Sequence, residues 1–362
     1  MEMEVGRVQT LVSGGGLREL LARFIRPANE RPENSKAIEG ISVPIVSLLQ
    51  PAEVLMNEIS RVCREWGFFL LTDHGISPSL IHHLQDVGKE FFELPQEEKE
   101  GYANNPSSGK VEGYGSQIIG GKSDRSSDWI DYFFHLIWPP SKLNFATWPS
   151  KPPSDRSVHS LNDIKSMYLS IFLSWNINDQ AFLKRREVTE EYTKEVLKLT
   201  DKLLELLSQG LGLKRETLKS MLGGEDIEFR IKINLYPPCP QPELTLGLEP
   251  RTDVGALTIL VSNEVPGLQV WKDGHWVAIE YIPDALIVNV GDQIEILSNG
   301  EYKSILHRSV VNKERTRMSW SVFSAPPLDA TIGPLSSLMK DDNPPKCATK
   351  TYKEYRHYKF NK

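Results

Sequence analysis

Apolar residues recur with a helical period in the first half of the chain. Between Pro51 and Trp66 they fall on one face of a helix, with Pro51 placed as its first residue and Gly67 just past its end. Two further segments have the same stripe, and a short apolar run lies between the first two. The pattern therefore predicts helices over residues 51–66, 77–95 and 188–210 and a buried strand over residues 68–71.

After Gly223 the period changes to two-residue alternation, which indicates β-strands and persists to about Pro326. In two of these strands apolar residues alternate with polar ones, so that each strand has a polar face. These polar faces consist of Arg230, Lys232, Asn234 and Tyr236 on the first strand, and of Arg317, Ser319, Ser321 and Phe323 on the second.

Asp-Gly and Asn-Gly pairs between the strand-like runs predict tight turns. Asp273-Gly274 and Asn299-Gly300 both have the residue types that two-residue hairpins need. Many short antiparallel strands joined in this way are typical of a jelly roll. We therefore expect an α+β fold, with a double-stranded β-helix (jelly-roll) core and flanking N-terminal helices.

Composition divides the chain into segments. The region 157–186 has neither a clean helical stripe nor turn chemistry, and we interpret it as an atypical insertion. It is a candidate retained intron, with a real surface loop as the alternative. The predicted segments are an N-terminal arm at 1–42, a helical and strand region at 43–156, the insertion at 157–186, a long helix and connector at 187–223, a jelly-roll domain at 224–328 and a C-terminal segment at 329–362.

Charge and cysteine content narrow the class of partner. The 362 residues include 48 acidic and 42 basic side chains and have a formal charge of −6, which disfavours binding to nucleic acid or to an anionic membrane. No export signal and no apolar run of membrane-spanning length is visible. Cys63, Cys239 and Cys347 are far apart, as expected of free thiols in a reducing compartment. We expect a cytoplasmic monomer with a small-molecule partner.

Three separate features of the β-rich half could carry chemistry together. Arg317 and Ser319 share a strand face and could hold a carboxylate, although an exposed strand face is the commoner meaning of such a pair. Asp253 alone is typical of a turn, and His307 alone is typical of hydrogen-bonded structure. The order of an acid, a histidine and then Arg-x-Ser along one β-rich region favours the chemical interpretation.

With these residues in place, the chain resembles the plant 2-oxoglutarate-dependent non-haem iron dioxygenases, most closely the flavonol synthases and next the anthocyanidin synthases. The resemblance covers nearly the whole chain apart from residues 157–186. Among the segments that carry it are "EWGFFLLTDHGIS", "KINLYPPCPQPELTLGLEP" and "VNVGDQIEILSNGEYKSILHRSVVNKERTRMSWSVF".

The resemblance implies an Fe(II) site with 2-oxoglutarate and O2 as co-substrates and ascorbate as a supporting reductant. Two histidines and one carboxylate hold the metal in such enzymes. Asp253 and His307 match two of these ligands, but the third position is Arg251. A guanidinium group offers no lone pair to a metal and stays charged at neutral pH. An ion pair between Arg251 and Asp253 would relieve the added charge but would occupy the carboxylate.

The resemblance also assigns residues to the two organic ligands. Without it, Phe134 and Phe323 would be taken for core residues. Ala325 departs from the relatives, which commonly have glutamate before the Pro-Pro pair. The implied 2-oxoglutarate residues are Arg317, Ser319, Tyr236 and Asn234, and the implied flavonoid residues are Lys232, Phe134, Phe323 and Tyr132.

The implied activity is that of a flavonol synthase-like oxidoreductase, which desaturates dihydroflavonols to flavonols. We expect this activity to be impaired because Arg251 replaces a histidine ligand. One alternative is a catalytically inactive relative or a ligand-binding remnant. Another is a different flavonoid oxidation on the same scaffold, such as flavanone 3-hydroxylation.

Overall fold

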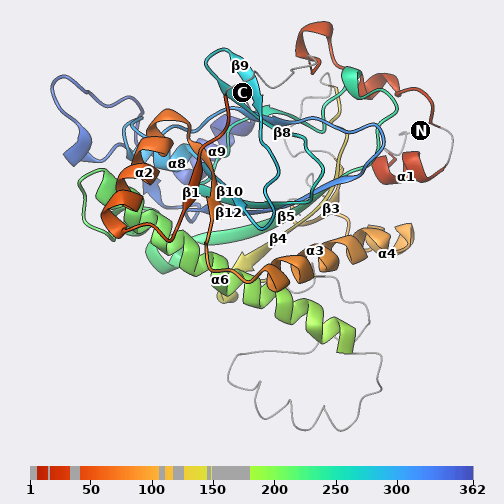
Figure 1. Ribbon diagram of the computed structural model, residues 1–362, viewed down its shortest axis with the longest axis horizontal. Coiled ribbons are helices and arrows are strands. Elements are labelled where there is room, and N and C mark those ends of the chain that lie inside the picture. The colour runs from red at the N-terminus through yellow and green to blue at the C-terminus, as the bar shows by residue number, and fades with distance from the viewer. Residues whose placement is uncertain are drawn as a thin grey trace.

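The computed structural model describes residues 6–14, 17–32, 41–105, 111–116, 126–144, 148 and 180–361. Figure 1 shows a large and a smaller sheet flanked by helices. The large sheet consists, in order, of β1 (Ile45–Ser47), β2 (Phe68–Thr72), β10 (Leu286–Val290), β7 (Leu257–Ser262), β12 (Arg317–Ala325), β5 (Glu228–Tyr236), β4 (Asp131–Trp138) and β3 (Gly113–Gly115). The smaller sheet consists of β6 (Leu248–Arg251), β11 (His307–Ser309), β8 (Leu268–Lys272) and β9 (His275–Ala278), and β13 (Thr331–Ile332) pairs with β14 (Lys350–Thr351).

The described α-helices flank these sheets, and α2, α3 and α6 agree with the three helical periods of the sequence. The α-helices are α1 (Val8–Ser13), α2 (Ala52–Glu65), α3 (Pro78–Glu93), α4 (Gln96–Glu100), α6 (Gln180–Gly210), α7 (Thr217–Met221), α8 (Asp292–Leu297) and α9 (Tyr352–Phe360). Helix α6 begins before the predicted start at Val188, so its first turns lie in the segment interpreted as an insertion. The rest of that segment, residues 157–179, lies outside the described residues. None of the helices described is both long enough and apolar enough to cross a membrane.

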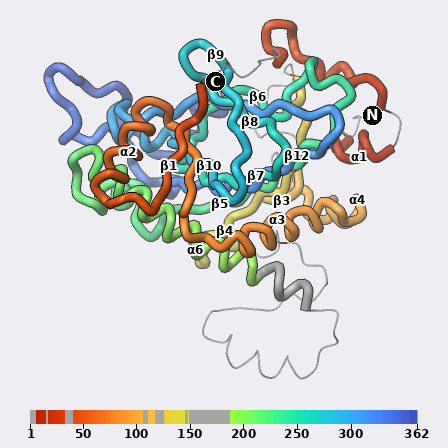
Figure 2. Tube along the Cα trace, viewed as in Figure 1, coloured from red at the N-terminus to blue at the C-terminus, as the bar shows by residue number. Residues whose placement is uncertain are grey.

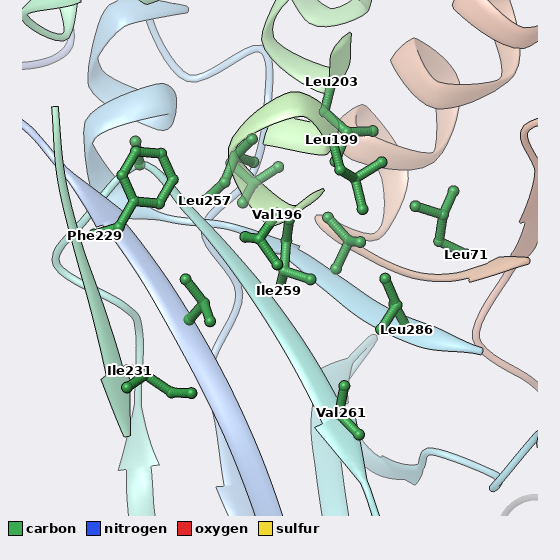
Figure 3. Packing of buried hydrophobic residues seen from close by; sticks show 14 of the residues in the cluster. Leu71, Val196, Leu199, Leu203, Phe229, Ile231, Leu257, Ile259, Val261 and Leu286 are labelled. Atoms are coloured by element: carbon green, nitrogen blue, oxygen red, sulfur yellow. The ribbon is translucent and has the colours of Figure 1, made fainter. Parts of the chain in front are cut away.

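The predicted alternation is confirmed in β5 and β12, which lie side by side in the large sheet. Their apolar residues, including Ile231 and Trp320, belong to the main hydrophobic cluster. Helix α6 covers this face, as Figure 3 shows for Val196, Leu199 and Leu203 packed over the apolar side chains of the sheet. The polar residues of both strands therefore face the opposite side, toward the smaller sheet.

One predicted hairpin is correct and the other is wrong. Asp273 and Gly274 join β8 to β9 with positive φ angles of 48° and 85°. Asn299 and Gly300 also have positive φ angles, but they follow the end of α8. The Gly300 amide donates to the carbonyl of Glu295 at 2.8 Å, which closes the helix. Left-handed residues serve both a hairpin turn and a helix C-terminus, so local sequence did not separate the two.

The N-terminal arm is fastened to the body of the protein. Figure 2 places α1 at the end of the molecule that carries α4, and Arg7 forms an ion pair with Glu100 there at 2.7 Å. Val8 and Phe24 of the arm are buried in a cluster that includes Trp129. All three cysteines fall in the described part of the chain and are free thiols.

A glycine in the middle of α3 marks a close approach of this helix to the sheet. Glycine inside a helix costs about 1 kcal/mol relative to alanine. At Gly88, however, an added Cβ atom would lie 2.3 Å from Nε1 of Trp320. Trp320 is completely buried within the main hydrophobic cluster. The contact between helix and sheet therefore outweighs helix propensity at this position.

We expect Gly88→Ala to lower the free energy of unfolding by about 1–3 kcal/mol, because overpacking exceeds the gain in helix propensity. Urea denaturation followed by circular dichroism measures the change. His83→Ala, at an exposed position of the same helix, is the control and should stay within about 0.5 kcal/mol of the parent. A stabilised Gly88→Ala variant would contradict the close contact.

Candidate active site

A pocket of about 280 Å³ is lined by strands of both sheets and by α9. It brings together every residue that the sequence assigned to a site. These residues are Arg317, Ser319, Tyr236, Asn234, Lys232, Phe134, Phe323, Tyr132, Asp253, His307 and Arg251. Residues far apart in the sequence therefore contribute to one pocket, as predicted.

The register of β5 and β12 builds one end of the pocket. Arg317 lies opposite Tyr236 and Ser319 lies opposite Asn234 in the antiparallel pair. The Asn234 amide donates to the Ser319 hydroxyl at 3.2 Å, and the Arg317 guanidinium lies 5.0 Å from the centre of the Tyr236 ring. The register therefore places one amide group and one hydroxyl group near the Arg317 cation.

The Arg317 guanidinium is buried without a full set of partners. Arg317 is only 2% exposed, and its Nε and Nη1 groups have no hydrogen-bond partner among the described residues. Burial lowers the pKa of Arg317, although the contact with Tyr236 opposes that shift. Unpaired buried donors are costly, and a carboxylate can pair with two guanidinium N–H groups at once. This end of the pocket fits a carboxylate ligand.

The predicted flavonoid residues lie further along the same strands. Phe134 of β4 is opposite Lys232, and the Lys232 ammonium lies 4.1 Å from the centre of the Tyr132 ring. Phe134 and Phe323 are half-buried and line the pocket instead of the hydrophobic core. Burial lowers the pKa of Lys232 to about 7, and the positive charge of Arg251 adds to the shift.

Asp253 and His307 come together at the pocket wall. Their Oδ1 and Nε2 atoms are 3.5 Å apart. Thr258 and Asn289 donate to the other carboxylate oxygen of Asp253 at 2.6 and 2.8 Å. Burial by itself raises the pKa of Asp253, but His307 and these hydrogen bonds hold it below the ordinary value. The two hydrogen bonds to Oδ2 leave the Oδ1 atom of Asp253 facing the His307 imidazole.

Arg251 lies beside this pair, but its guanidinium pairs with a different carboxylate. It lies opposite His307 in the pairing of β6 and β11. Its guanidinium is 3.5 Å from the Asp128 carboxylate and donates to the Glu249 carbonyl at 3.2 Å. Arg26 of the N-terminal arm also pairs with Asp128. The ion pair with Asp253 that the sequence suggested is therefore replaced by one with Asp128.

The donor set is incomplete for the metal of a two-histidine, one-carboxylate site. Nowhere in the described ranges do three or more His, Cys, Asp or Glu side chains gather in a way that could hold a metal ion. Asp253 and His307 offer two donors, whereas Arg251 offers none. The residues present thus fit a carboxylate ligand at Arg317 but do not by themselves complete a site for Fe(II).

The pocket also contains residues that the sequence did not identify as functional. Tyr352, Arg356 and Phe360 reach it from α9, and Phe68 reaches it from β2. The ring of Phe68 lies 5.2 Å from that of His307. No local pattern marks these residues, because the docking of distant segments places them at the pocket.

The fold and this site define the class of protein. A family model described as the 2OG-Fe(II) oxygenase superfamily matches residues 228–326, and one described as the non-haem dioxygenase in morphine synthesis N-terminal matches residues 43–155. The chain belongs to the 2OG-Fe(II) oxygenases, which are dioxygenases of the oxidoreductase class that use Fe(II) and 2-oxoglutarate. The predicted family and the α+β jelly-roll fold are confirmed.

Individual relatives extend over almost the whole chain. A flavonol synthase/flavanone 3-hydroxylase of Arabidopsis thaliana is 45% identical, over 99% of both chains. A leucoanthocyanidin dioxygenase of Malus domestica is 39% identical, over 98% of this chain and 94% of its own. The crystal structure of JOX2 in complex with 2OG, Fe and JA is similar with a TM-score of 0.83 and 37% identity, covering 99% of this chain and 95% of the other.

The ion pairs of Asp128 give a test of stability. Replacing Asp128 by asparagine leaves Arg26, which is 2% exposed, without its main counter-charge. Loss of one partner from a buried ion pair costs about 3–5 kcal/mol. We expect a decrease of this size in the free energy of unfolding of Asp128→Asn, measured by urea denaturation.

The matched control for this test is Glu30→Gln. Glu30 also faces Arg26, at 3.8 Å, but its side chain is 51% exposed. Exposed ion pairs contribute roughly 0–1 kcal/mol. Equal losses in the two variants would contradict a special role for Asp128.

Proposed function

We propose that this chain is a flavonol synthase-like dioxygenase whose activity on dihydroflavonols is impaired by Arg251. The observation that carries the proposal is the buried Arg317 guanidinium, which lines the pocket and whose Nε and Nη1 atoms have no hydrogen-bond partner among the described residues. In this proposal Arg317 and Ser319 bind the distal carboxylate of 2-oxoglutarate, with Tyr236 and Asn234 beside them. The names of relatives such as the flavonol synthase/flavanone 3-hydroxylase support a flavonoid as the second ligand.

The flavonoid part of the proposal rests on the shape and chemistry of the pocket wall. Phe134 and Phe323 present rings to the pocket, and aromatic rings stack on planar ligands. Lys232 and Tyr132 offer polar groups that can bond phenolic oxygens. Ala325 lines the pocket without a polar side chain, so one contact to the substrate ring that relatives commonly make is missing.

The impairment follows from the chemistry of the third ligand position. At 251 the chain has a cation with no lone pair next to His307, where an imidazole would complete the ligand set. Two unit charges a few ångströms apart at an effective dielectric of about 20 repel by several kcal/mol. Asp128 and the Glu249 carbonyl offset part of this charge. We infer that Fe(II) binds weakly and that little flavonol is formed.

A second candidate function is a binding protein that keeps the 2-oxoglutarate site without turnover. This function is favoured because the carboxylate-binding end of the pocket is intact while the set of metal ligands is incomplete. Succinate release under Fe(II), O2 and 2-oxoglutarate, with and without dihydroflavonol, separates the two. Release coupled to flavonol formation supports the impaired enzyme, whereas 2-oxoglutarate binding with no release supports the binding protein.

The division of the chain into segments, its cellular compartment and its oligomeric state are also part of the proposal. Matches of the family models to residues 43–155 and 228–326 support a helical and strand region at 43–156 and a jelly-roll domain at 224–328. The free cysteines support a reducing, cytoplasmic environment. We propose that the protein is a monomer. We also propose that residues 157–186 are an insertion, which transcript sequencing across this region tests.

The first test of this proposal concerns the co-substrate. We expect Arg317→Ala to weaken 2-oxoglutarate binding about ten- to a hundredfold, because a hydrogen-bonded charged contact contributes about 1.5–3 kcal/mol. Isothermal titration calorimetry on metal-free protein measures the dissociation constant. Arg315→Ala is the control, since Arg315 is exposed and pairs with Glu264. Unchanged binding in Arg317→Ala would disprove the location of the carboxylate site.

The second test concerns the metal. We expect Arg251→His to tighten Fe(II) binding at least about tenfold, since even groups around a metal's ligands change affinity ten- to a hundredfold. Anaerobic Fe(II) titration gives the affinity, and succinate release gives the turnover. Arg251→Gln is the matched control, because it removes the charge without adding an imidazole.

The outcomes of the metal test are distinct. Tight binding in the histidine variant alone identifies the missing ligand as the cause. Equal gains in both variants would assign the impairment to charge. Robust turnover by the unmodified protein would refute the impairment itself.

A further inference from the structure

The polar face of β5 carries an ammonium group that has no acidic neighbour on the sheet. Lys232 lies opposite Phe134 on β4 and opposite Ser321 on β12. On its own strand the residues two positions away, which share its face, are Arg230 and Asn234. None of these four neighbours carries a negative charge. The sheet therefore places a cation in the pocket wall without a matching anion beside it.

Two carboxylates on other elements act on Lys232, but both already have partners. Asp128 pairs with Arg251 at 3.5 Å, and Asp253 lies 3.5 Å from His307. Their negative charges raise the pKa of Lys232, but burial and the positive charge of Arg251 outweigh them. Within the part of the chain that the structure describes, the Lys232 ammonium has no ion-pair partner.

Tyr132 does not supply the missing negative charge. The Lys232 ammonium lies 4.1 Å from the centre of the Tyr132 ring, over its face. The Tyr132 hydroxyl accepts a hydrogen bond from the Asn104 amide at 3.0 Å, and burial raises the pKa of this tyrosine. Tyr132 therefore stays a neutral phenol and offers only the modest attraction of an aromatic face. The charge of Lys232 is left for a ligand to match.

A dihydroflavonol can match this charge through one of its phenol groups. An isolated phenol ionises at about pH 10. The hydroxyl para to the ring carbonyl of a dihydroflavonol is more acidic, because the carbonyl delocalises the negative charge of the phenolate. A lysine ammonium has hydrogen-bond donors only, and its bond to an anionic oxygen is roughly twice as strong as a bond between neutral groups.

We propose that Lys232 binds its flavonoid as a phenolate, through the hydroxyl para to the ring carbonyl. The inference rests on the proposed function, because it takes a dihydroflavonol as the ligand. Where the lysine is neutral, the O–H bond of the phenol breaks and its proton forms a new N–H bond at Nζ. Where the lysine is already an ammonium, the phenol proton leaves to solvent. Both routes end in the same pair of ammonium and phenolate.

The pair defines a class of substrate within the dihydroflavonols. The ligand needs a free hydroxyl para to the ring carbonyl, and ethers at the same oxygen lose the contact because they cannot ionise. Phe134, opposite Lys232, presents a ring on which the planar body can stack. Arg251 adds a second positive charge that favours the phenolate, in keeping with its effect on Lys232.

Absorbance spectroscopy detects the bound charge directly, because a phenolate absorbs at longer wavelength than its phenol. The probe is dihydrokaempferol, added to metal-free full-length protein saturated with 2-oxoglutarate at pH 6, where the free ligand is a neutral phenol. We expect the bound ligand to show the phenolate band that the free ligand shows only in alkali. A bound ligand with the neutral spectrum would overturn the inference.

An ether analogue tests the same contact without a spectrum. The 7-O-methyl ether of dihydrokaempferol cannot ionise at the oxygen para to the carbonyl. We expect calorimetry to show that the ether binds at least about tenfold more weakly than dihydrokaempferol, since a charge-assisted hydrogen bond is lost. Equal affinities of the two ligands would count against a bound phenolate.

Variants assign the effect to Lys232. Lys232→Met should lose the phenolate band and bind dihydrokaempferol and its ether equally. Lys232→Arg keeps a cation and should keep the band, which makes the test independent of how well the methionine variant folds. Lys353→Met, at an exposed position of α9 outside the pocket, is the matched control and should behave as the parent. A band retained in Lys232→Met, or lost in Lys232→Arg, would overturn the assignment.

Failure of this inference is distinguishable from failure of the proposed function. If dihydrokaempferol binds in its neutral form, the flavonoid site stands and only the inference is refuted. If 2-oxoglutarate binds but neither flavonoid does, the flavonoid part of the proposed function fails and the inference fails with it.

Discussion

The two-residue period of β5 and β12 is the constraint on which the pocket depends. Both strands are buried on both faces, so alternate residues belong to the core under α6 and to the pocket. A slip of one residue in either strand would exchange the two sets. Trp320 would then enter the pocket, and Arg317 would enter an apolar core where a lone cation is very costly. The burial of the apolar face thus determines where the polar residues point.

This local character explains what sequence alone could predict. The period is a property of neighbouring residues, and it correctly separated Arg317, Ser319 and Lys232 from the core. The helical period is local in the same way, and it correctly predicted the apolar stripes of α2 and α3. The position of Asp253 beside His307 is not local, and it was predicted only through the resemblance to a family.

What the sequence did not predict depends on tertiary contacts. Arg356 and Phe360 line the pocket because Asp292 of α8 holds α9 in place, and nothing near residue 356 indicates that contact. The partner of Arg251 is a similar case. Chemistry excludes arginine as a metal ligand, but only the fold brings Asp128 within reach. Asn299-Gly300 failed as a hairpin for the opposite reason, since one local signal serves two structures.

Asp128 makes Arg251 easy for the folded protein to accommodate. A half-buried guanidinium without a counter-charge would ordinarily destabilise the fold, but here a carboxylate and a backbone carbonyl pair with it. Under the proposed impairment, folding and metal affinity would therefore be under separate control at this position. Cellular quality control responds to unfolding and not to a missing ligand. If Arg251 impairs the chemistry as proposed, the chain would still persist at normal abundance, and the defect would be visible only through its products.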